Sequence, residues 1–234
     1  MFGYFYGIDI TYIVLVLPAI IFTMIAQSRV NSTFKKYSAQ RTMRGLTGAE
    51  VAQRMLSAFG IPNVRIERTS GNLTDHFDPK ANVIRLSDSV YNSTSVAAAG
   101  VAAHECGHAM QYASGYGPIK IRNKIIPVCQ IGSTLSMPMI LFGFIFSWQG
   151  IVDIGILFFA LATVFQLVTL PVEFNASRRA LATLESAGIL SESENSSAKK
   201  VLSAAAMTYV AALAVSLVQL IRLILLFGGG RRRD

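Results

Sequence analysis

The sequence has little charge and few cysteines for a chain of 234 residues, and each shortage excludes a class of protein. Only 15% of the residues are charged, against about 25% in typical soluble proteins, while 52% are hydrophobic. This composition argues against an ordinary soluble globular protein. Cys106 and Cys129 are the only cysteines, and two cysteines in such different surroundings give no disulfide framework.

The positive charge is unevenly distributed along the chain. Lys and Arg number 21 against 13 Asp and Glu, a net charge of +8 that could suit nucleic acid, anionic lipid or membrane-flanking loops. No Lys or Arg precedes Arg29, five fall between Arg29 and Arg44, and residues 201–221 carry no charge. No basic stripe with interleaved aromatic residues is present, so nothing favours nucleic acid as a partner. We therefore expect a membrane protein whose surroundings are a lipid bilayer.

Four apolar runs are long enough to cross a bilayer, whose core of about 30 Å needs roughly 20 helical residues. They are Ile10 to Ala26, Ile125 to Phe146, Ile151 to Val172 and Val201 to Phe227. The second and third runs are separated by a short turn containing Trp148, which suits a membrane interface and predicts a transmembrane hairpin. The fourth run is interrupted by Arg222, so it either spans or lies along the surface; we favour a span.

These runs divide the chain into five segments with different expected roles. Residues 1–28 form an N-terminal transmembrane anchor, 29–124 a catalytic region, 125–172 the hairpin, 173–200 a helix and connector, and 201–234 a C-terminal transmembrane helix with a basic tail. The polar segment 29–124 is long enough to hold a small core if it packs against the membrane helices. The predicted fold class is an α-helical membrane protein with about four transmembrane helices and a small α+β domain.

The distribution of basic residues predicts the orientation of a multi-pass cell-membrane protein. With the N-terminus outside and four crossings, 17 of the Lys and Arg fall in segments 29–124 and 173–200, which are then cytoplasmic under the positive-inside rule. Arg231, Arg232 and Arg233 end outside and depart from that rule locally. We expect the catalytic region to face the cytoplasm.

Local patterns place several elements in segment 29–124. Thr47 and Glu50 have the spacing of a capping box at the start of a helix that ends near Gly60. Alternation predicts a strand from Val64 to Arg68. After turns at Gly71 and Asp78, a second strand is expected at 83–86, and we expect it to be a sheet edge able to pair with an extended peptide. An Ala-rich helix is predicted from about 94 to 113, with Asn92 or Ser93 as its N-cap.

That Ala-rich helix contains the strongest chemical signal, the sequence His104-Glu105-Cys106-Gly107-His108. Residues four apart share one face of a helix, so the two imidazoles can bind one Zn²⁺ at about 2.0 to 2.1 Å. Glu105 is adjacent and can accept a proton from water. The alternative, a buried polar pair without metal, does not account for this spacing. Cys106 is expected to be a small apolar residue of the helix.

A catalytic zinc needs a third protein ligand and an open position, and the sequence offers two candidates, His76 and Glu173. Glu173 follows Pro171 at the end of the third apolar run and begins a helix-compatible stretch. Two predicted crossings separate Glu173 from His108, and an even number returns the chain to the same side of the membrane. The topology therefore permits Glu173 to reach the metal.

The chain resembles a known family over nearly its whole length. The resemblance rests on the first span, Leu73 to Pro79, Arg85 to Ser87, and Ala102 to Gln111 with its two histidines. They are similar to the YugP-type membrane zinc metallopeptidases of bacteria and, more distantly, to the HtpX heat-shock proteases and the CAAX prenyl proteases.

The resemblance implies a zincin-like peptidase with one Zn²⁺. It assigns His104, His108 and Glu173 as ligands and Glu105 as the base, with a peptide or protein as substrate, membrane proteins among the candidates. In related enzymes an Asp often stands four residues after the ligand Glu, where this chain has Ser177, whose hydroxyl can bond an imidazole but adds no charge.

Three alternatives stay open from the sequence. His76 has a possible catalytic role, and the donor to the developing oxyanion could be His76, Tyr112, Tyr209 or Arg178. A non-catalytic membrane adaptor with a structural zinc would need a closed shell of four protein ligands and would not need Glu105. An intramembrane protease would need the helix itself to span, but its apolar part, 96–103, is too short. The oligomeric state is not readable from the sequence.

Overall fold

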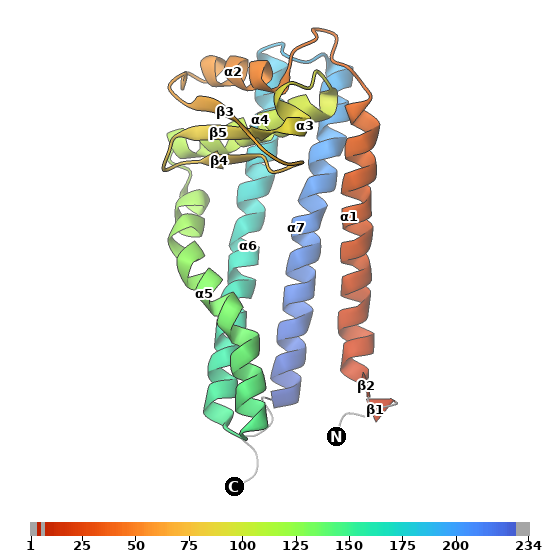
Figure 1. Ribbon diagram of the computed structural model, residues 1–234, viewed down its shortest axis with the longest axis vertical. Helices are drawn as coiled ribbons and strands as arrows, with labels where there is room; N and C mark the ends of the chain where they lie inside the picture. The colour runs from red at the N-terminus through yellow and green to blue at the C-terminus, as the bar shows by residue number, and fades with distance from the viewer. Residues whose placement is uncertain (1–3, 6–7, 228–234) are drawn as a thin grey trace. The chain divides into compact units, whose positions relative to one another are not determined.

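The computed structural model describes residues 4–5 and 8–227 (Figure 1). The expected basic tail, with Arg231 to Arg233, lies outside the described residues. The strands are β1 (Tyr4–Phe5), β2 (Ile8–Asp9), β3 (Arg65–Thr69), β4 (His76–Asp78) and β5 (Val83–Ser87). The helices are the π-helix η1 (Tyr12–Val16), α1 (Leu17–Ser38), α2 (Gly48–Ala58), α3 (Asp88–Tyr91), α4 (Val96–Ala113), α5 (Gly117–Ile145), α6 (Gln149–Ser186) and α7 (Glu192–Phe227).

The chain divides into two compact units. The first comprises Met1–Ala26, Lys120–Leu170 and Thr208–Asp234, and the second comprises Gln27–Ile119 and Pro171–Met207. The long helices α1, α5, α6 and α7 each contribute residues to both units. The second unit holds all three strands of the larger sheet together with α2, α3 and α4.

The four apolar runs of the sequence form four helices that are long and apolar enough to cross a membrane, as predicted. They are Tyr12–Ser38, Gly117–Ile145, Gln149–Ser186 and Glu192–Phe227. All four extend beyond the expected runs: the first continues to Ser38, α5 begins at Gly117, α6 continues to Ser186 and α7 begins at Glu192. Pro171 does not end α6, since a proline removes one backbone hydrogen bond that a long helix can forgo when its neighbours pack well.

In the first unit, α5 and α6 form the expected helical hairpin, and small residues let their backbones approach. A side chain at Gly155 would place its Cβ 2.9 Å from the Ser136 carbonyl oxygen, and one at Gly132 would lie 3.3 Å from the Phe158 carbonyl oxygen. Glycine removes this steric limit, as is common between membrane helices. The buried contacts of this unit join α5, α6 and α7 through Ile140, Val152 and Leu223.

The second unit contains a three-stranded sheet with the order β3-β5-β4. Strand β5 pairs parallel with β3 and antiparallel with β4, with Ile84 opposite both Ile66 and Phe77. The expectation that residues 83–86 form a sheet edge is therefore wrong: β5 is the central strand, and its buried Val83, Ile84 and Leu86 suit that place. The two edges are β3 and β4, and the three mostly polar residues of β4 give too weak an alternation to be recognised as a strand.

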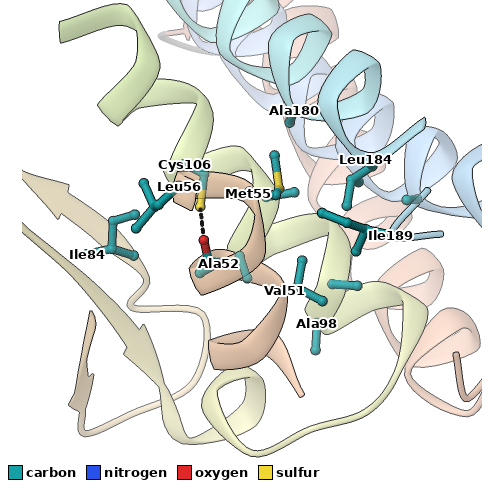
Figure 2. Packing of buried hydrophobic residues seen from close by; sticks show 14 of the residues in the cluster. Val51, Ala52, Met55, Leu56, Ile84, Ala98, Cys106, Ala180, Leu184 and Ile189 are labelled. Carbon is teal, nitrogen blue, oxygen red and sulfur yellow. Dashed lines mark hydrogen bonds between the residues drawn. The ribbon is translucent and has the colours of Figure 1, made fainter. Parts of the chain in front are cut away.

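The core of the second unit packs α2 against α4, the sheet and the end of α6. Figure 2 shows apolar side chains of α2 lying next to those of α4 and of the segment from Ala180 to Ile189. The predicted capping box is present, because Thr47 accepts a hydrogen bond from the Glu50 backbone N–H while the Glu50 carboxylate accepts one from the Thr47 N–H. Cys106 is fully buried and donates its thiol to the Ala52 carbonyl, so it is part of the core as expected.

Two local expectations about helix ends need correction. The N-cap of α4 is Ser95, whose hydroxyl accepts from the Ala98 N–H, and neither Asn92 nor Ser93 has this role. The expected connector within segment 173–200 is short, because polar residues 192–197, expected to be solvated, form the start of α7. Glu194 is 3% exposed and accepts hydrogen bonds from the backbone N–H groups of Met43 and Ser191, so its carboxylate joins two segments of the second unit.

Candidate metal centre

Three side chains with metal-binding atoms converge in the second unit. His104 and His108 lie one turn apart on α4, with their ring centroids 4.8 Å apart, and Glu173 comes from α6. One potential ligand atom from each lies within 4.8 Å of the other two. Among the described residues, these three are the histidine, cysteine or acidic side chains that lie close enough together to share one metal ion. The structure thus brings together the three residues that the sequence analysis assigned to zinc.

Gly107 explains how α6 comes so close to α4. A Cβ at this position would lie 2.3 Å from the Ala176 carbonyl oxygen and 3.1 Å from the Ala176 Cα, which no real side chain could occupy. Gly107 stands between Glu105 and His108, and Ala176 stands three residues after Glu173, so the two helices approach each other closely beside the metal-binding side chains. The glycine in the motif therefore permits the close helix packing that brings Glu173 near the two histidines.

The Glu173 carboxylate lies at distances from the two imidazoles that suit ligands of one zinc ion. The Glu173 Oε2 atom lies 3.2 Å from His104 Nε2 and 3.6 Å from His108 Nε2. Tetrahedral ligands at about 2.0 to 2.1 Å from a metal are about 3.4 Å apart, so these separations bracket the expected value. Two imidazoles and one carboxylate also form a donor set typical of catalytic zinc, in which the fourth position is left for water or substrate.

The remaining ring nitrogens of both histidines have protein partners. His104 Nδ1 lies 3.1 Å from the Ser177 hydroxyl, and His108 Nδ1 lies 3.1 Å from the Gln111 Oε1 atom. Each imidazole is thus held on its far side while its Nε2 atom faces Glu173. Such outer contacts orient metal-binding histidines and select their tautomers. Ser177 stands four residues after Glu173, where related enzymes often have an Asp, and its hydroxyl is the group that contacts His104.

Glu105 lies on the same helix but is more deeply buried than His104 and His108. Its side chain is buried, and this burial raises its pKa to about 7, with the negative charges of Glu173 and Asp75 adding to the rise. The positive charge that His104 can carry and a hydrogen bond from the Phe77 backbone N–H act in the opposite direction. A carboxyl group with a pKa near neutrality can both accept and return a proton at physiological pH.

His76 does not join this group. It lies on β4, exposed to solvent, with Nδ1 2.9 Å from the Thr74 carbonyl oxygen and Nε2 3.5 Å from Arg85. Its neighbour Phe77 contacts Tyr112 of α4, and successive residues of a strand point to opposite faces, so His76 points away from the metal-binding helix. The structure therefore gives no support to His76 as a ligand or a catalytic residue.

The other candidate donors to an oxyanion differ in position. Tyr112 is on α4, four residues after His108 and thus on the same helix face, with its ring against Phe77. Arg178 is exposed on α6, and Tyr209 is on α7, in a segment assigned to the other unit.

Two residues near the site were missed by the sequence analysis. Gln111 is fully buried and contacts His108, and Asp75 contributes negative charge near Glu105 while accepting two hydrogen bonds from Ser87. Gln111 could have been noticed as a long polar residue three positions after His108 on an otherwise Ala-rich helix. No pattern in the sequence signals Asp75, because its proximity depends on how β4 packs against α4.

Residues 12–228 match the model of a protein family described as "Putative neutral zinc metallopeptidase". The chain is also 44% identical over 220 residues to the Bacillus subtilis (strain 168) protein named "Putative membrane protease YugP", an alignment that covers 94% of this chain and 98% of that protein. No solved structure matches the chain.

Proposed function

Because the chain belongs to the family described as "Putative neutral zinc metallopeptidase", we propose that it is a multi-pass membrane peptidase that hydrolyses peptide bonds at the cytoplasmic face of the membrane. The observation that carries this proposal is the convergence of His104, His108 and Glu173, with Glu105 buried beside them. The four long apolar helices and the similarity to a membrane protease support the location in a membrane.

We assign His104, His108 and Glu173 as the ligands of one zinc ion and Glu105 as the general base. When bound, zinc polarises a carbonyl group and makes water more acidic. Glu105 takes a proton from the attacking water and gives it to the nitrogen of the departing amine, which needs a carboxyl group able to change its protonation state. Its burial, and the resulting pKa of about 7, suit that exchange.

The open character of the site favours hydrolysis over a structural role for zinc. Structural zinc sites are usually closed by four protein ligands. In the described part of the chain, the group that can hold a metal has three members, and Glu105 is a carboxyl group that metal binding alone would not require. This arrangement supports a peptidase rather than a zinc-stabilised membrane adaptor.

Strand β4 offers the substrate a place to bind in extended form. Among the described residues no strand pairs with β4 on the side away from β5, so one edge of the sheet is free. The Phe77 backbone N–H of this strand donates a hydrogen bond to Glu105. A peptide that adds to this edge as a further strand would pass beside the general base, with main-chain hydrogen bonds supplying affinity for many sequences.

Three variants of the purified, full-length protein test the catalytic assignment against an unstructured protein substrate. Glu105→Gln should retain zinc and lose cleavage, while Glu173→Gln should lose zinc as well as cleavage. His76→Gln is the matched control and should retain both, since its side chain is exposed on the opposite face of the sheet. Unchanged cleavage by Glu105→Gln would disprove the base assignment, and a fourth protein ligand found at the metal would favour the adaptor.

A cysteine-labelling experiment tests the proposed orientation. Both native cysteines are buried, whereas Met43 is 83% exposed in the unit that contains the metal centre. In intact cells, Met43→Cys should react with a membrane-impermeant maleimide only after the membrane is permeabilised. Labelling of intact cells would place the metal centre outside and refute the cytoplasmic assignment. The unsubstituted protein is the control for reaction of Cys106 and Cys129.

A further inference from the structure

Gln111 is a fully buried polar side chain, and all of its hydrogen bonds lie close to the metal centre. It is three residues after His108 on α4 and reaches across to α6. Its Oε1 atom is 3.1 Å from His108 Nδ1, while its Nε2 atom is 2.7 Å from the Val172 carbonyl oxygen and 3.1 Å from Asn175 Oδ1. A buried amide is costly unless its donors and acceptor are paired, so this one has a specific orientation.

The partners of Gln111 fix the direction of every hydrogen bond in the group. The Val172 carbonyl oxygen can only accept, so the amide nitrogen of Gln111 must face it. Arg179 Nε can only donate, and it lies 2.8 Å from Asn175 Oδ1, so that oxygen also accepts from Gln111. With both amide hydrogens of Gln111 directed towards α6, its oxygen is left for His108.

The arrangement fixes the hydrogen on one ring nitrogen of His108, and among the neutral forms of the imidazole it selects one tautomer. Because Gln111 Oε1 is an acceptor, His108 must carry a hydrogen on Nδ1 and donate it. A neutral imidazole with a hydrogen on Nδ1 has its lone pair on Nε2, the atom that faces Glu173. The contact between His104 and Ser177 imposes no such direction, since a hydroxyl can donate or accept.

We propose that Gln111 is a positioning residue, which, together with Asn175 and Arg179 of α6, holds His108 in the tautomer and ring orientation that metal binding requires. This inference rests on the proposed zinc-binding function and adds to it a residue outside the ligand set. It also gives a reason for the Glu173 helix to carry Asn175 and Arg179: the same turn of α6 that supplies a ligand also orients another ligand on α4.

Wild-type protein alone provides the first test. The chain has three histidines, so ¹⁵N-histidine labelling of the zinc-loaded protein gives few signals. His76→Gln removes one set of signals, and Ser177→Ala, which alters the Nδ1 partner of His104, distinguishes His104 from His108. We expect the Nδ1 hydrogen of His108 to give a downfield, slowly exchanging proton signal, with Nε2 bound to the metal. A His108 that binds zinc through Nδ1, or whose Nδ1 hydrogen exchanges rapidly with water, would overturn the proposal.

Substitution of Gln111 provides the second test. Gln111→Leu removes the acceptor and should raise the zinc dissociation constant, measured by competition with a chromophoric chelator, by about 10- to 100-fold. It should also change the visible absorption of the cobalt-substituted protein and abolish the slow exchange at His108. Gln111→Glu keeps an acceptor for His108 but removes the two donors to α6, so it should lose less zinc affinity than Gln111→Leu without reaching the wild-type value. Equal losses in both variants would show that the acceptor is not what matters.

Ser95→Ala is the matched control for general damage to α4. It removes the N-cap of the same helix and should lower thermal stability, but it leaves the zinc dissociation constant and the cobalt spectrum unchanged, since Ser95 lies at the opposite end of α4. Unchanged zinc affinity in Gln111→Leu overturns the role of Gln111 while leaving the peptidase proposal intact. Failure of the wild-type protein to bind zinc at all would overturn the peptidase proposal itself, and with it the inference that rests on it.

Discussion

The buried carboxyl group of Glu105 should make the metal-free protein less stable at neutral and alkaline pH than a variant without the charge. Its pKa rises from 4.5 to about 7, chiefly because burial removes water from the carboxylate. At about 1.4 kcal/mol per pH unit, this difference of about 2.5 corresponds to about 3 kcal/mol once the group is fully ionised. Glu105→Gln keeps an oxygen to accept from the Phe77 N–H and carries no charge, so it should recover this energy.

The pH dependence of this gain has a definite sign. The pKa of the folded state lies above that of the unfolded state, so the folded wild-type protein holds its proton more firmly and loses stability as pH rises from about 4.5 to 7. Glu105→Gln has no such loss. The difference in stability between the two proteins should therefore be near zero below pH 4, grow through that interval, and stay constant above about pH 8.

Thermal unfolding in detergent measures this effect. With metal removed by chelator, Glu105→Gln should melt roughly 6 to 12 °C above wild type at pH 8.5. Added zinc should reduce the difference, because a nearby dication favours the carboxylate. Glu50→Gln is the control of opposite sign, since hydrogen bonds from Thr47 lower the pKa of Glu50 and its loss should destabilise the protein at neutral pH. A melting temperature of Glu105→Gln equal to or below that of wild type at pH 8.5 would refute the reasoning.

Three further predictions concern packing and the ligands. Gly107→Ala should lower the free energy of unfolding by about 1 to 3 kcal/mol and weaken zinc binding, because the new Cβ meets the backbone of α6. Gly100→Ala is the control: its Cβ would lie 3.5 Å from its nearest neighbour, so stability and zinc affinity should not change. Equal melting temperatures for the two variants would contradict this prediction. Leu56→Ala should cost about 2 to 5 kcal/mol of unfolding free energy without changing zinc affinity, and a loss of affinity would show that the core and the site are coupled. Ser177→Ala should weaken zinc binding by about 10-fold in a chelator competition, and an unchanged affinity would show that its contact with His104 is incidental.

The elements that could be predicted from the sequence are those with local causes. The capping box of Thr47 and Glu50 needs only two residues three apart, and the structure contains it. The four long helices follow from uninterrupted apolar runs, whose ends the sequence placed less well: α7 begins at Glu192, where polar residues suggested a connector. Helix ends depend on packing as well as on propensity, as the buried Glu194 illustrates.

The place of β5 within the sheet has no local cause in the sequence, and its prediction as an edge strand was wrong. The residues of β5 were predicted to form a strand, but whether a strand is central or at an edge depends on its partners. The short β4 supplies that second partner and carries His76, whose side chain the pleat then directs to the face away from α4.

The sequence by itself determined that His104 and His108 share a face, because a helix repeats every 3.6 residues and four residues make about one turn. It also provided Glu173 as a candidate at the end of an apolar run. Only the tertiary structure decided that α6 approaches α4 at Gly107, that Gln111 and Ser177 hold the two imidazoles, and that Glu105 is buried. The physical reason is that helix periodicity acts between neighbours in the chain, whereas a distance of 3.2 Å between residues 104 and 173 is set by the packing of side chains from separate helices.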